Sequence, residues 1–142
     1  MCASRSDEVP PYSRHLTISW DAVTRCVYAE FTGFATSAEF RAGTMKILDE
    51  IRERHSDALI SDNRRLEVVT NEDQLWIRDT WVPQAAAVGL KRIAVVLAHQ
   101  GLGKFASQEI INRFPKMVFV TRTFDSVDEA KKWVAGEGRL AK

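Results

Sequence analysis

A chain of 142 residues is long enough for one domain, and 45% hydrophobic and 27% charged residues make an ordinary globular composition. A net charge of +1 gives no electrostatic reason to expect nucleic acid as a partner. No apolar run approaches the ~20 residues that span a bilayer, and the N-terminus lacks the apolar core of a secretory signal. We therefore expect a cytoplasmic protein without an integral membrane segment.

Residues that bind metals or form disulfides are few and scattered. Cys2 and Cys26 are too few for a disulfide framework. His15, His55 and His99 lie far apart in the sequence, and there is no CxxC motif or Cys/His cluster. Neither a metal nor another cofactor is expected.

The chain opens with a polar segment, residues 1–13, which we expect to be a flexible leader. A single domain is expected over residues 14–136, followed by a polar tail at 137–142. Alternating apolar and polar residues predict half-buried strands at 15–20 and 25–32, joined as an antiparallel hairpin.

Three helix starts share one capping pattern. A Ser or Thr hydroxyl can accept a hydrogen bond from the amide three residues later, while an acidic side chain at that position reaches back. The pairs that fit are Thr36–Glu39, Thr70–Asp73 and Ser126–Glu129. The helices predicted from them cover about 37–55, 71–89 and 127–135. Pro83 lies inside the second of these helices and is expected to bend or split it.

The other predicted elements lie between these helices in the sequence. A short buried strand is predicted at 58–60, followed by a polar loop at 62–65. The nearly continuous apolar run at 92–98 predicts a central strand covered on both faces. A helix at 107–114 and a strand at 116–123 complete the order. Strands that alternate with helices imply parallel pairing through right-handed crossovers.

Several different short motifs follow one another along the chain. They are Phe31-Thr32-Gly33-Phe34, Ser61-Asp62-Asn63-Arg64, Glu72-Asp73-Gln74-Leu75-Trp76, Trp81-Val82-Pro83, Ala87-Val88-Gly89-Leu90 and Phe124-Asp125-Ser126. With the order of elements, they resemble the STAS domain superfamily (sulphate transporter and anti-sigma factor antagonist). The closer resemblance is to small stand-alone bacterial proteins described as STAS/SEC14-like or SpoIIAA-like, and it covers roughly residues 12–134.

The resemblance implies an α/β domain of STAS fold, whose mixed sheet of about five strands is backed by helices on one side. It also implies an interaction or signalling module and not a catalyst. Typical STAS antagonists carry Asp-Ser-Ser-Gly at the start of the second helix, where a partner kinase phosphorylates one serine. Here that region reads Val69-Thr70-Asn71-Glu72-Asp73, so the phospho-switch is not carried over. Thr70 is interpreted as a helix cap.

Polar residues gather where the buried strand is expected to give way to the second helix. Asp62, Asn63 and Arg64 stand at the strand exit, where open α/β sheets bind ligands. The alternative is that the Asx side chains bond loop amides and pair with the arginines. Trp76 points about 140° away from the face that carries Trp81. It therefore either packs under the preceding loop or serves as a contact residue.

A second polar region follows the 92–98 strand. Gly101-Leu102-Gly103-Lys104-Phe105-Ala106 has the outline of a dinucleotide fingerprint, but three residues separate the strand from its first glycine. Lys104 either meets an anionic group or is solvated. His99 is the best general-base candidate, with Asp62 as a candidate orienting partner. The alternative is a solvent-exposed loop histidine.

The sequence as a whole predicts a non-catalytic interaction or small-ligand-binding module and no catalytic residue. Its partner would be a protein or a small apolar or anionic molecule, and homodimerisation is an open option. The alternatives are a small enzyme using His99 and the Asp62 loop, or an anion or nucleotide binder at Gly101–Lys104. Because parallel strands end at one edge of a sheet, the predicted binding residues are Asp62, Asn63, Arg64, Asp73, Trp76, Gly101, Gly103 and Lys104.

Overall fold

The structure is a computed structural model that describes residues 14–115 and 118–137. The expected leader at 1–13, part of the expected strand at 116–117 and most of the tail at 138–142 lie outside the described residues. The strands are β1 (Leu16–Asp21), β2 (Cys26–Gly33), β3 (Ala58–Leu66), β4 (Arg92–Val96) and β5 (Val120–Phe124). The helical segments are α2 (Ser37–Arg54), α3 (Asn71–Trp76), η1 (Ile77–Trp81), α4 (Val82–Ala87), α5 (Leu102–Arg113), α6 (Val127–Lys132) and η2 (Trp133–Glu137).

The five strands form one sheet in sequence order, β1-β2-β3-β4-β5. β1 and β2 are antiparallel, with Leu16 opposite Phe31 and Asp21 opposite Cys26, and each later pair is parallel. The predicted mixed sheet with an opening antiparallel hairpin is therefore confirmed. Since each parallel connection advances one strand in the same direction, the sheet has no reversal of strand order and hence no switch-point crevice.

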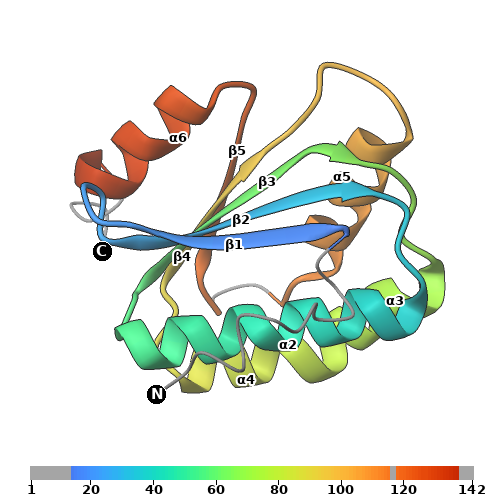
Figure 1. Cartoon of the computed structure of the whole chain (residues 1–142), viewed down its shortest axis with the longest axis horizontal. Helices are drawn as coiled ribbons and strands as arrows, with labels where there is room; N and C mark the ends of the chain where they lie inside the picture. Colours follow the sequence, from blue (N-terminus) through green and yellow to red (C-terminus); the bar gives the residue numbers. More distant parts are fainter. Residues whose placement is uncertain (1–13, 116–117, 138–142) are drawn as a thin grey trace.

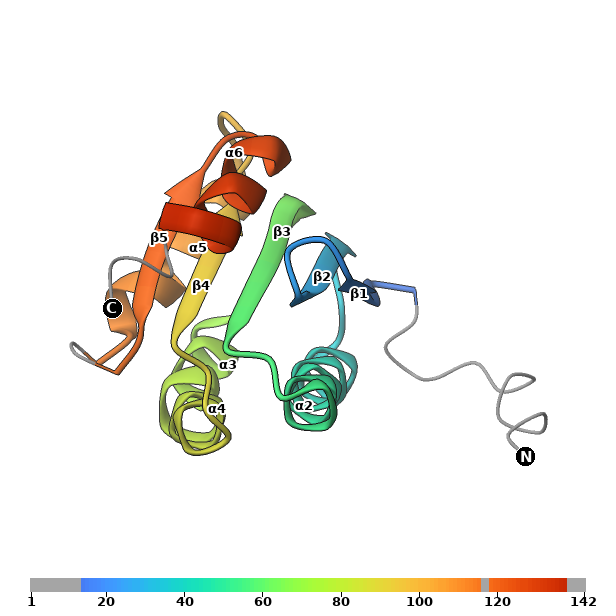
Figure 2. The same ribbon diagram turned by 90° about the vertical axis from the view of Figure 1, so that its left-hand side faces the viewer.

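Helices lie on both faces of the sheet. Figures 1 and 2 show α2, α3 and α4 on one side of the strands and α6 on the other. The larger core joins that first layer and α5 to side chains such as Phe31, Leu59 and Val95. The smaller core places Trp133 and its neighbours against the small residues Cys26 and Ala94. The expectation of helices on one side only is wrong for α6, because the second face of the central strands is also apolar and needs cover.

The predicted helix caps are confirmed. Thr36 forms a full capping box, in which Glu39 N donates to Thr36 Oγ1 over 3.2 Å and Thr36 N donates to Glu39 Oε1 over 2.9 Å. The Thr70 hydroxyl likewise accepts from Asp73 N over 3.2 Å, and the Ser126 hydroxyl from Glu129 N over 3.3 Å. Local side-chain chemistry thus sets where α2, α3 and α6 begin.

Pro83 splits the second helix, as predicted. The segment between α3 and α4 is a π-helical turn, in which Val82 N bonds to Ile77 O. Pro83 has no amide hydrogen to give to Asp79, so the helix loses a regular bond at this point. The chain resumes as α4, and Gly89 with φ 103° follows its end.

Regular structure extends further than predicted at two places. The loop expected at 62–65 is wrong, because β3 continues to Leu66 and pairs there with Gly33. A bulge makes this possible: Glu30 faces Asp62 but Thr32 faces Arg65, so β3 has one extra residue. The helix expected from 107 begins earlier, at Leu102, with Gly101 at its N-cap.

Candidate functional site

A cavity of about 80 Å³, called the interior cavity below, lies against the larger core and is partly open to solvent. It lies between the sheet and the layer formed by α2, η1 and α5, and its walls are mainly apolar. Typical wall residues are Phe40, Ile47, Leu59, Val95 and Ile110. A single buried water needs roughly 10–15 Å³, so this space is several times larger than a water site.

The π-helical turn forms one wall of the cavity. Ile77 and Trp81, the first and last residues of η1, both line it. Trp81 Nε1 donates to the carbonyl oxygen of Thr44 over 2.7 Å, which fixes the indole against α2. The widened turn before Pro83 therefore sets where a large aromatic wall residue stands. Such single π turns often occur at functional sites.

A chain of three polar side chains crosses the cavity wall from β3 to α5. Ser61 Oγ donates to Asn63 Oδ1 over 2.7 Å, and Asn63 Nδ2 donates to Ser107 Oγ over 3.0 Å. Ser107 is 1% exposed and Asn63 8% exposed. Within the described part of the chain, the Ser107 hydroxyl accepts this bond and donates none. Its proton is therefore available to a hydrogen-bond acceptor in the cavity.

The α5 wall of the cavity is tied to α3 by polar contacts. Gln74 Nε2 donates to Glu109 Oε1 over 3.0 Å, and Arg113 Nε donates to Gln74 Oε1 over 3.0 Å. Arg113 Nη2 also donates to Asn71 Oδ1 over 2.6 Å. A molecule larger than the present cavity would need these contacts to break so that α5 could move outward.

Asp62 and Arg64 point to the opposite face of the sheet from Asn63. Arg64 Nε and Nη2 bind the two Asp62 oxygens over 2.9 and 2.8 Å, and Tyr28 Oη donates to Asp62 Oδ2 over 2.6 Å. Burial raises the pKa of the Asp62 carboxyl, but the bonds from Arg64 and Tyr28 outweigh burial and hold that pKa below its ordinary value. Burial and the bond to Asp62 also raise the pKa of the Tyr28 hydroxyl. These groups satisfy one another, which agrees with the structural alternative for Asp62 and Arg64.

Asp73 and Trp76 also have partners inside the domain. Asp73 accepts from Ser37 Oγ and from Arg41 Nε, each over 2.8 Å, and so joins the start of α3 to α2. The Arg41 guanidinium lies over the Trp76 ring, 5.3 Å from its centroid, and the indole packs against the larger core. The packing interpretation of Trp76 is therefore the one that the structure supports.

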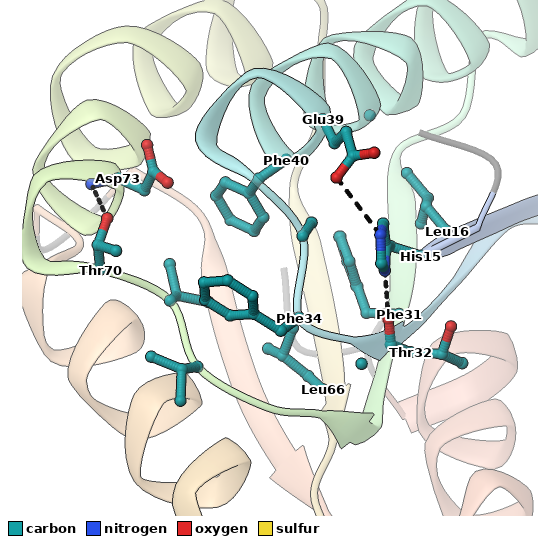
Figure 3. Close-up of a pocket in the computed structure, with 15 residues that line it drawn as sticks. His15, Leu16, Phe31, Thr32, Phe34, Glu39, Phe40, Leu66, Thr70 and Asp73 are labelled. Atoms are coloured by element: carbon teal, nitrogen blue, oxygen red, sulfur yellow. Dashed lines mark hydrogen bonds and ion pairs between the residues drawn. The ribbon is translucent and has the colours of Figure 1, made fainter. Parts of the chain in front are cut away.

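Asp73 borders a second, much smaller hollow at the ends of β2 and β3, drawn in Figure 3. His15 lies between two acceptors there, 3.2 Å from Thr32 O and 3.4 Å from Glu39 Oε1. Phe34, which is 53% exposed, stands at the same hollow. With a volume of about 10 Å³ the hollow can hold at most one water, so it is not a ligand site in this conformation.

The glycine-rich segment has structural roles. Gly101 has φ 111°, a backbone conformation that glycine adopts without strain. A Cβ on Gly103 would overlap the carbonyl oxygen of Leu66, so this position needs glycine to let α5 pass the end of β3. Lys104 Nζ donates to the carbonyl oxygen of His99 over 3.1 Å. Both Lys104 and His99 line an open cleft of about 420 Å³ at the ends of β4 and β5.

The predicted binding residues are thus distributed over separate places. Asn63 lines the interior cavity, Asp62 and Arg64 lie on the other face, Asp73 and Trp76 join α3 to α2, and Lys104 lines the cleft. Asp62 does not line the cleft that contains His99, so the structure does not assemble the proposed His99–Asp62 pair. Sequence reasoning missed Ser107, whose spacing from Ile110, Ile111 and Phe114 places it on the apolar face of α5.

Over residues 14–115 and 118–137, no helix has the length and apolar character to cross a membrane. The same residues contain no group of three or more His, Cys, Asp or Glu side chains placed to hold a metal ion. The sequence matches no protein-family model, and neither a curated protein nor a solved structure matches it.

Proposed function

We propose that this domain binds a small, uncharged and largely apolar molecule in the cavity between the sheet and α2, η1 and α5. The observation that supports this proposal is a cavity with mainly apolar walls, one of which contains the hydrogen-bonded side chains of Ser61, Asn63 and Ser107. Ligand sites are commonly concave and apolar, with a few polar groups that fix orientation. Since none of the described residues that line this cavity is charged, a charged ligand would lose its hydration without compensation.

The energy of packing supports the same proposal. Protein interiors are close-packed, and voids larger than a water are few. At roughly 24 cal/mol per Å³, an enclosed cavity of 80 Å³ would cost the fold about 2 kcal/mol, and a partly open one costs less. A ligand that fills the space recovers part of that cost, and its binding stabilises the native state by mass action. The unpaired donor at Ser107 favours a ligand with one hydrogen-bond acceptor, such as a ketone or an ether.

We further propose that the domain is a non-catalytic module of STAS-like type. The STAS part of the proposal rests on the sequence motifs and is supported by the mixed sheet with its antiparallel opening hairpin. The absence of catalysis is favoured because the Asp62 carboxylate is already bound by Arg64 and Tyr28. Among the described residues, no Asp, Glu, His, Cys or Lys side chain lines the interior cavity.

Matched small molecules test the ligand class. Cyclopentanone and methylenecyclopentane have similar shape, but only the ketone has an acceptor for Ser107. Both should raise the melting temperature and shift the methyl resonances of Val95 and Ile110, and the ketone should bind more tightly. Ser107→Ala should remove the preference for the ketone, because the donor is lost. Ser56→Ala, at a buried serine elsewhere, should keep that preference.

A variant with a smaller cavity provides a second test. Val95→Leu places an extra methylene in the cavity wall and should weaken binding of both molecules while the protein remains folded. If neither molecule shifts the methyl resonances of the native protein, or if Val95→Leu binds them unchanged, the cavity is not the binding site.

A further inference from the structure

The interior cavity is longer along the strands than its volume alone suggests. α5 joins two parallel strands and so runs back along the sheet, and its cavity residues extend from Ser107 to Phe114. Seven residues of an α-helix rise by about 10 Å. On α2, which also joins two parallel strands, the cavity residues extend over the same number of positions, from Phe40 to Ile47. A volume of about 80 Å³ spread over such a length makes the cavity a narrow channel.

The two ends of this channel differ in exposure and in polarity. Ser107, in the first half of α5, is 1% exposed, and its hydroxyl proton is available to a ligand. Further along the helix, Ile110, Ile111 and Phe114 are half-buried. Apart from Ser61 of the central strand β3, every other described residue around the cavity is buried. The cavity therefore opens beside the apolar second half of α5, and the hydrogen-bond donor lies at its closed end.

Ile111 stands where the cavity meets the outside of the domain. Together with Gln108, Asn112 and Thr123 it also lines an open hollow of about 340 Å³ between α5 and the edge strand β5. A chain that leaves the cavity past Ile111 enters this hollow. The contacts that tie α5 to α3 resist a wide molecule, but a linear one can become longer through the opening without displacing the helix.

We infer that the ligand is a linear aliphatic molecule with its hydrogen-bond acceptor at one end, such as a methyl ketone; this inference rests on the proposed binding in the interior cavity. The carbonyl oxygen accepts from Ser107 at the closed end, and the alkyl chain lies along Ile110 and leaves past Ile111. A carbonyl in the middle of the chain would have to place an alkyl arm on each side of Ser107. The channel therefore selects for the position of the acceptor as well as for apolar character.

Three ketones test the shape and the orientation. They are methyl ethyl ketone, methyl pentyl ketone and dipropyl ketone, and the last two are isomers. Their dissociation constants follow from the methyl resonances of Val95 and Ile110. Methyl pentyl ketone should bind at least about tenfold more tightly than methyl ethyl ketone, because each fully buried methylene contributes about fourfold. It should also bind about fivefold more tightly than dipropyl ketone, the gain expected for one hydrogen bond. Intermolecular NOEs should place the end of its pentyl chain next to Ile111.

Substitutions locate the two ends of the ligand. Ile111→Phe narrows the opening and should weaken binding of methyl pentyl ketone several-fold, while methyl ethyl ketone, which stays inside, binds as before. Ile18→Phe makes the same change at a half-buried isoleucine outside the cavity and should leave the ratio of the two affinities unchanged. Ser107→Ala should remove the preference for methyl pentyl ketone over its isomer.

The outcomes separate this inference from the proposed function. Equal binding of the two isomers, no gain with chain length, or an equal effect of Ile111→Phe on both chain lengths overturns the inference. The proposed function stands in those cases if cyclopentanone still binds. If neither cyclopentanone nor any of the three ketones shifts the methyl resonances, both are wrong.

Discussion

Gly103→Ala should destabilise the domain, although the same change in an open helix normally stabilises it. A Cβ at this position would overlap the Leu66 carbonyl oxygen and lie 2.8 Å from the Leu66 carbonyl carbon. Real Cβ contacts essentially never fall below 3.0 Å, and the obstacle is backbone, so α5 or the end of β3 must move. Overpacking costs about 1–3 kcal/mol, and the helix preference of alanine over glycine returns up to about 1 kcal/mol. We expect a net loss of about 1–2 kcal/mol.

Urea unfolding followed by circular dichroism measures this change. A loss of about 1–2 kcal/mol corresponds to a melting temperature lower by roughly 2–8 °C for a domain of this size. Gly136→Ala is the matched control, because a Cβ there meets nothing within 4 Å and the glycine has no positive φ. The control should unfold at nearly the same urea concentration as the native protein. If Gly103→Ala matches or exceeds native stability, the close approach of α5 to Leu66 is not a constraint.

Three further predictions concern local contacts. Thr70→Ala should cost about 0.5–2 kcal/mol in urea unfolding by removing the cap of α3, whereas Thr70→Asp should be tolerated; phosphorylation of Thr70 that alters partner affinity would contradict this role. Arg92 donates from Nη2 to Asp57 over 2.7 Å, but its buried Nε and Nη1 lack partners among the described residues. Asp57→Ala should therefore lower the unfolding free energy more than Arg92→Met, which removes the buried charge; the reverse order would contradict this account. The folded pKa of Asp62 is depressed, so its stabilising contribution is present at neutral pH and is lost as pH falls through that pKa. Tyr28→Phe removes one of the bonds that depress it and should move the acid-unfolding midpoint to higher pH, measured by circular dichroism; an unchanged midpoint would remove Tyr28 from the explanation.

Features determined by neighbouring residues could be predicted from the sequence. The caps at Thr36, Thr70 and Ser126 depend on atoms three residues apart, and the split at Pro83 follows from one missing amide. Periodicity indicated where β1, β2 and β4 lie, because alternation predicts a half-buried strand and a continuous apolar run such as that of β4 predicts burial on both faces. These signals do not depend on where distant segments lie.

Features determined by tertiary partners could not be predicted. A strand through Asp62 and Arg64 is stable because Tyr28 of the neighbouring strand bonds Asp62, and a bulge opposite Phe31 lets the pairing continue to Leu66. Sequence spacing cannot show either partner, so the segment resembled a loop. The interior cavity likewise depends on how η1 and α5 approach each other. Ser107 lines this cavity and accepts a hydrogen bond from Asn63, which lies 44 positions away in the sequence. The candidate site is therefore only partly predictable.

The strand order has a consequence for how the chain could assemble during synthesis. Each strand after β1 pairs with the strand before it in the sequence, so no strand needs a distant segment as its first partner. The entropic cost of closing each connection rises by only about 0.6 kcal/mol for each doubling of the connection's length. The sheet can therefore grow outward from the β1–β2 hairpin, one strand and helix at a time, as domains that emerge from the ribosome do. The face of the sheet opposite α2 is covered last, because α6 and η2, which pack on it, are the last described elements. Much of that face consists of the small side chains Cys26, Ala58 and Ala94, which keep the apolar area exposed during this interval small.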